Sequence, residues 1–109
     1  MSDGTVDQND AILAHVEAIG GGYVWESDVF AVTLFDVTAS DAQVVPLSHL
    51  RGVEQIALNC SRLSFSTIEA VAHIPGLCSL VLGRAALSSE QLATLRRIVP
   101  QVQVVANEP

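Results

Sequence analysis

Leu77-Cys78-Ser79-Leu80-Val81-Leu82 carries apolar residues at its first, fourth and sixth positions, and it decides the fold because the chain repeats this pattern. The pattern occurs at a constant step, also over 53–58 and, before that, over 29–34. A weaker copy at the same step covers 101–106. The alternation of apolar and other residues in each copy is typical of a strand with one buried face. The repeat units are therefore 29–52, 53–76, 77–100 and a degenerate 101–106.

In the second half of each unit, apolar residues recur at the same spacing, which is the distance in sequence from position 53 to position 77. This half of the unit predicts a helical turn. Apolar residues spaced by three, as at Ile68, Val71 and Ile74, suit a helix that buries one stripe. Serine favours the N-cap position of a helix, so the serines before these segments are interpreted as caps and not as nucleophiles. They are Ser40, Ser64 and Ser88.

Local signals refine where these helices begin. Gln91 follows Ser88 by three residues, which is the spacing of a capping box. In the second unit Ser66-Thr67-Ile68-Glu69 offers an alternative start of the same kind. A helix that began at Ser40 would lose a backbone hydrogen bond at Pro46. We therefore expect a late, short or 3₁₀ turn that begins at Pro46, where a first-turn proline is tolerated.

The period and the L-x-x-L-x-L pattern resemble the leucine-rich-repeat family over about residues 29 to 106. Val45-Pro46-Leu47-Ser48-His49-Leu50 is similar to the PL-x-x-L segment common in short bacterial members. The resemblance implies a right-handed α/β solenoid with a parallel sheet on its concave face and short helices on its convex face. It also implies a role in protein–protein recognition. Where the family has an asparagine after each strand, this chain has Asp36 or Val37, Cys60 or Ser61, and Arg84 or Ala85.

Residues 1–28 are expected to form an N-terminal cap to the repeats of 29–109, with a disordered start, a helix and a hairpin strand. The apolar spacing predicts the helix over 10–19, and Gly20-Gly21-Gly22 then turns the chain. Tyr23-Val24-Trp25 is predicted to pair with 29–32 as a hairpin. This hairpin would cover the first edge of the sheet.

The C-terminal end of the repeats has no such cap in the sequence. No helical segment follows the last short strand, and an uncovered edge strand is prone to pair with another chain. A homodimer formed through the C-terminal edge is therefore an alternative role for the chain. In that case a charge at Val104 or Val105 should produce monomers.

Composition excludes several classes of function. A length of 109 residues predicts one domain. The net charge of −7 and the absence of lysine argue against nucleic acid as a partner. No apolar run approaches the roughly 20 residues that a membrane-spanning helix needs. The start, Met1-Ser2-Asp3-Gly4-Thr5-Val6-Asp7, lacks the basic and apolar segments of a signal peptide, so we expect a cytoplasmic protein without membrane association.

The chemically reactive residues predict no enzyme, metal or cofactor. Cys60 and Cys78 would lie roughly 20 Å apart on neighbouring strands at about 3.3 Å per residue. That separation is too long for a disulfide, so both should be free thiols. His49 and His73 would stack on helices about 8–10 Å apart, which is too far to share one zinc ion. No nucleophile, base and orienting group converge in the predicted fold.

The face of the sheet opposite the buried residues is the predicted functional surface. Its side chains are small and mostly uncharged, which resembles the core of an interface, although an unselected neutral surface has the same composition. The hypothesis is an interaction module that binds a partner protein on this concave face; a narrower version is a small acidic inhibitor or immunity-type protein. The predicted binding residues are Ala31, Thr33, Phe35, Gln55, Ala57, Asn59, Ser79, Val81 and Gly83, and the fourth strand would add Gln103, Val105 and Asn107.

Overall fold

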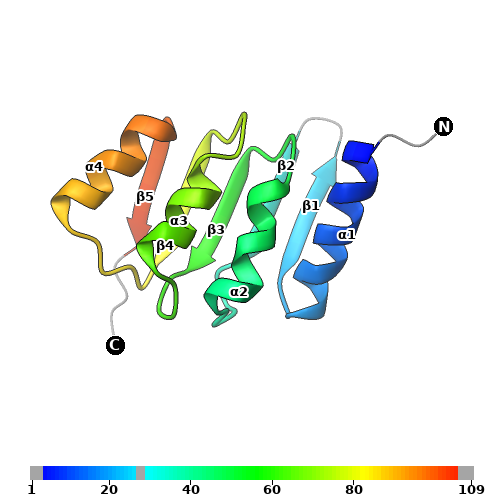
Figure 1. Cartoon of the computed structure of the whole chain (residues 1–109), viewed down its shortest axis with the longest axis horizontal. Coiled ribbons are helices and arrows are strands. Elements are labelled where there is room, and N and C mark those ends of the chain that lie inside the picture. The colour runs from blue at the N-terminus through cyan, green and yellow to red at the C-terminus, as the bar shows by residue number, and fades with distance from the viewer. Residues whose placement is uncertain (1–3, 27–28, 106–109) are drawn as a thin grey trace.

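The structure, a computed structural model, describes residues 4–26 and 29–105. These residues form a sheet and a layer of helices that covers one of its faces (Figure 1). In chain order the elements are α1 (Gly4–Ala18), β1 (Gly22–Glu26), β2 (Val29–Leu34), α2 (Asp41–Val44), the 3₁₀ helix η1 (Val45–His49), β3 (Gln55–Asn59), α3 (Phe65–Ala72), β4 (Ser79–Gly83), α4 (Ser89–Ile98) and β5 (Gln101–Val105).

The five described strands lie in the sheet in the order in which they occur in the chain, β1-β2-β3-β4-β5. β1 runs antiparallel to β2, with Tyr23 opposite Val32 and Val24 opposite Ala31, so the predicted hairpin is confirmed. The pairs β2–β3, β3–β4 and β4–β5 are all parallel. Each parallel step needs a crossover, and α2 with η1, α3 and α4 supply it.

The predicted leucine-rich-repeat solenoid is wrong. The described residues form a small α/β fold whose single sheet is mixed and is neither curled nor closed, unlike the curved parallel sheet of that family. The antiparallel hairpin was itself expected as a cap, and it makes the sheet mixed at β1–β2. A sheet that does not curl has no concave face, so the side without helices is called the open face below.

The repeat step survives as a register between strands. Ala31 pairs with Gln55 and Gln55 pairs with Ser79, so each pair is separated by one repeat step. The last pairing differs from the prediction. The repeat step predicted that Ser79 pairs with Gln103, but Ser79 pairs with Gln101. α4 is two residues longer than α3, and β5 begins soon after its end. A shift of two residues keeps each side chain on its predicted face, because side chains in a strand alternate with a period of two.

The helix starts agree in part with the capping signals. Ser88 accepts a hydrogen bond from the Gln91 amide and completes the predicted capping box. Ser64, and not the alternative start at 66–69, is the N-cap of α3. In the first unit the 3₁₀ helix begins at Val45, next to Pro46, but a helical turn from Asp41 precedes it. The proline is accommodated because it falls in the first turn of η1, where its missing N–H is not needed.

α1 is longer than the predicted helix over 10–19, because it begins at Gly4 and ends at Ala18. The disordered start was expected before residue 10, but residues 4–9 belong to α1, and residues 1–3 lie outside the described part of the chain. Its inner face buries Ile12, Leu13 and Val16 against the first unit.

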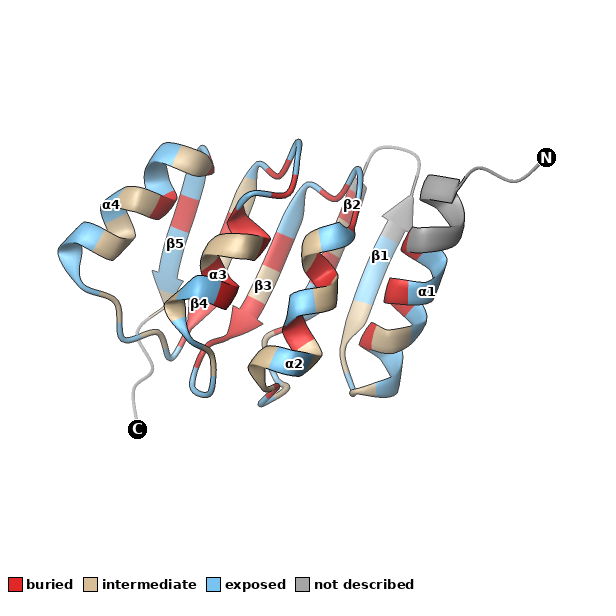
Figure 2. Ribbon diagram, in the orientation of Figure 1, coloured by how far each residue is buried: buried red, intermediate tan, exposed pale blue. Residues whose placement is uncertain are grey.

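The core lies between the sheet and the helices, where the red segments of strands and helices face one another (Figure 2). Phe30, Val32 and Leu34 alternate along β2 and are buried. The repeat alignment assigned the first core position of this strand to Val29, whose side chain lies outside the described residues. The other strands, the helices and the loop after η1 contribute further large and fully buried side chains: Leu47, Leu50, Ile56, Leu58, Ile68, Leu80, Leu82 and Leu95.

Candidate functional site

The open face consists of the strand residues that alternate with the core positions. All described helices lie on the opposite side of the sheet, so no described element covers it (Figure 1). Registers place Thr33, Ala57 and Val81 in one row across three strands. Despite the register shift of β5, its open-face residues include Gln103 and Val105 as predicted, while Asn107 lies outside the described residues. The open face comprises Val24, Ala31, Thr33, Phe35, Gln55, Ala57, Asn59, Ser79, Val81, Gly83, Gln101, Gln103 and Val105.

None of these described open-face side chains carries a charge. A shallow depression of about 480 Å³ lies over β1, β2 and β3, and Val24, Ala31 and Ala57 contribute its apolar lining. Val24 is 49% exposed at its margin. The depression is therefore an accessible, uncharged surface and not a closed ligand cavity.

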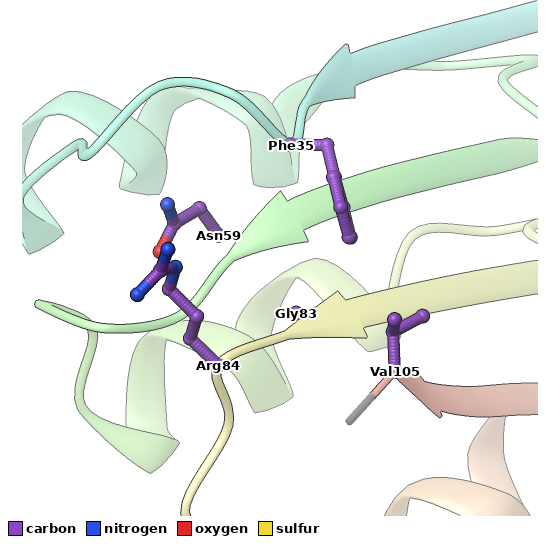
Figure 3. A pocket seen from close by; sticks show the side chains of 5 residues that line it. All are labelled: Phe35, Asn59, Gly83, Arg84 and Val105. Carbon is purple, nitrogen blue, oxygen red and sulfur yellow. The ribbon is translucent and has the colours of Figure 1, made fainter. Parts of the chain in front are cut away.

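Two of the predicted open-face residues, Asn59 and Gly83, are buried instead of exposed. At Gly83 the cause is Phe35, whose ring lies across β3 and reaches β4 (Figure 3). A Cβ atom on Gly83 would lie 2.7 Å from Cε1 of this ring, so only glycine leaves room for it. A small cavity of about 60 Å³ remains between Phe35, Asn59, Gly83, Arg84 and Val105.

A larger polar hollow of about 450 Å³ continues from this cavity past the carboxyl ends of β2, β3 and β4. Carboxyl ends of parallel strands meet at one edge of a sheet, which is where open α/β sheets commonly bind ligands. Besides Phe35 and Asn59, the hollow is lined by Asp36, Thr38, Ser61 and Arg84.

The sequence reasoning did not select Asp36, Thr38, Ser61 or Arg84 as site residues. The available signal was the register itself, because 36, 60 and 84 occupy the same repeat position just after three parallel strands. The side chains therefore gather at one edge for a topological reason that the repeat already contained.

The remaining reactive residues form no site. Cys60 is buried and Cys78 exposed, and both are free thiols. Burial raises the pKa of the Cys60 thiol to about 11, so the thiolate is disfavoured. His49 and His73 are both exposed, and within the described residues no group of three or more His, Cys, Asp or Glu side chains is arranged to hold a metal ion.

No helix in the described part of the chain is long and apolar enough to cross a membrane. Comparisons with protein-family models, with curated proteins and with solved structures found no match to this chain. The fold and its surfaces define an α/β protein with one face of the sheet buried by helices and the other left open.

Proposed function

We propose that this chain is an interaction module that binds a partner protein on the open face of its sheet. One observation supports the proposal: helices bury one face of the sheet, while the described side chains of the opposite face carry no charge and no described element covers them. Exposed surfaces that are depleted in charge are characteristic of interaction sites. The row of Thr33, Ala57 and Val81 lies at the centre of this surface.

The charge distribution suggests the kind of partner. The chain has a net charge of −7, and none of the described acidic side chains lies on the open face. A partner that fits would present an uncharged patch to the open face and basic residues around that patch. Opposite charges outside the contact accelerate association, so binding should slow as salt is added.

A pair of matched substitutions tests the proposal. Ala57→Glu places a charge at the centre of the open face, whereas Ala93→Glu places the same charge on the exposed side of α4. Proteins from the source cells would be captured on the wild-type chain and on both variants, after circular dichroism has verified the fold. We expect a protein that binds the wild type and Ala93→Glu but not Ala57→Glu. Identical capture by both variants would refute the proposal.

A second candidate function is self-association through β5. β5 pairs with β4 and has no described strand on its other side. Val104 is on the core side of the sheet beside the fully buried Leu82, yet it is 38% exposed. A second copy that ran antiparallel along β5 would satisfy the free backbone groups and cover Val104.

Light scattering after size exclusion, over a series of concentrations, tests this second function. A stable interface buries roughly 1,200–2,000 Å² of surface, and a strand of five residues offers little area for such a contact. We therefore expect a dimer that dissociates on dilution. Val104→Lys should give monomers, whereas Val24→Lys at the opposite edge should not alter the mass. A constant mass of 11.5 kDa at every concentration would exclude self-association.

A further inference from the structure

Arg84 lines the polar hollow with an exposed side chain. Its guanidinium makes no hydrogen bond or ion pair with any other residue that the structure describes. Its backbone is left-handed, with φ of 55°, and it is the one described non-glycine residue in that region. The conformation is unfavourable for a residue with a Cβ atom, and the equivalent Asp36 and Cys60 do not adopt it. Such backbone strain clusters at binding sites.

Asn59 provides a second, independent donor in the same hollow. The residue is only 9% exposed, and its Oδ1 accepts a hydrogen bond from the Ser61 amide at 3.0 Å. This bond fixes the orientation of the side chain, and Nδ2 donates to no described protein group. Every fully buried polar side-chain atom of the described residues has a partner. Nδ2 is therefore accessible, and Asn59 is one of the residues that line the hollow.

We propose that this hollow, which Arg84 and Asn59 both line, binds a carboxylate group held by these two side chains. A guanidinium donates two parallel N–H bonds to the two oxygens of a carboxylate, and Nδ2 of Asn59 supplies a third donor. The ring of Phe35 forms an apolar wall for the carbon chain attached to the group. Asp36 lines the same hollow, and its charge opposes a dianion more strongly than a singly charged carboxylate. This site goes beyond the proposed function and does not depend on it.

The test uses acetyl-Ala-Ala-Ala with a free carboxyl terminus, the same peptide with an amidated terminus, and acetate. Binding is followed by ¹⁵N NMR on the side-chain NH₂ of Asn59 and the Nε–H of Arg84. We expect saturable shifts with the free acid and roughly tenfold weaker binding of the amide, because hydrogen bonds to a charged acceptor are the stronger ones. Acetate that also shifts these signals would assign the site to small carboxylic acids, and a response to the peptide alone would assign it to protein chain ends.

Arg84→Gln should abolish the shifts at Asn59, whereas Arg62→Gln, at an exposed arginine outside the hollow, should leave them unchanged. The same spectra show whether each variant is folded. Equal shifts with acid and amide, retained shifts in Arg84→Gln, or no saturable response to either carboxylate would overturn the proposal.

Discussion

The side-chain amide of Asn9 forms two hydrogen bonds with the backbone of Arg51, far away in the chain. Nδ2 donates to the Arg51 carbonyl oxygen at 2.8 Å, and Oδ1 accepts from the Arg51 N–H at 3.0 Å. Asn9 belongs to α1 and is only 4% exposed, while Arg51 lies between η1 and β3. The amide therefore ties the N-terminal helix to the loop that closes the first repeat unit.

Asn9→Ala should lower the free energy of unfolding by about 2 kcal/mol, because two partly buried hydrogen bonds are lost and the Arg51 backbone is left unpaired. Urea denaturation measures the change. Asp10→Ala at the exposed neighbouring position is the control and should stay within about 0.5 kcal/mol of the wild type. If the two variants are equally stable, the pair contributes nothing to the docking of α1.

The sequence predicted the features that follow from local periodicity. Apolar columns such as Leu47, Val71 and Leu95 are buried as their spacing indicated, and the strand registers follow the repeat step up to β4. The curvature of the sheet was predicted wrongly because it depends on how whole layers pack, which the family pattern supplied only by analogy. The pair of Asn9 and Arg51 joins segments whose meeting no local pattern encodes.

Of the two candidate surfaces, the open face could be predicted from the sequence and the hollow could not. Alternation within strands predicted which residues lie on the side of the sheet away from the core, but not that Asn59 and Gly83 are buried there. The hollow at the carboxyl edge depends on the ring of Phe35 lying across a neighbouring strand and on the left-handed backbone of Arg84. Both are consequences of tertiary packing, because neither residue type prefers that arrangement in isolation.

Gly21 is required for close packing, although the sequence indicated only a turn at 20–22. A Cβ atom there would collide with the Leu34 side chain and lie 2.8 Å from the Thr33 carbonyl oxygen. Gly21→Ala should therefore lower the free energy of unfolding by about 2 kcal/mol, since overpacking of this kind costs about 1–3 kcal/mol. At Gly22 the nearest atom to a Cβ is 3.9 Å away, so Gly22→Ala is the matched control and should be nearly neutral. Thermal denaturation of both variants checks the difference, and equal melting temperatures would contradict it.

Because of Cys60, the stability of the fold should decrease as the pH rises into the alkaline range. Burial raises the pKa of its thiol from 9.0 to about 11. As pH rises past 9.0, the unfolded chain loses this proton before the folded chain does, so the folded state is progressively disfavoured up to about pH 11.

Urea denaturation at several pH values should show that wild-type stability falls more steeply over this range than that of Cys60→Ala. Cys78→Ala removes an exposed thiol and should keep the wild-type slope. Parallel pH profiles for the wild type and Cys60→Ala would show that the buried thiol does not contribute.

Arg84→Gly should make the protein more stable while removing the proposed carboxylate site. Relief of the left-handed backbone gains about 1–2 kcal/mol, and the added freedom of glycine in the unfolded chain offsets about 0.4–1 kcal/mol. The difference between the two ranges is about 0–1.6 kcal/mol, so the expected net gain in urea denaturation is about 0.8 kcal/mol. Arg62→Gly, at an exposed residue without positive φ, should lose stability instead. If Arg84→Gly gains stability and loses carboxylate binding, the fold keeps an unfavourable residue at a position where it serves a ligand. If Arg84→Gly gains no stability, the backbone at this position is not strained.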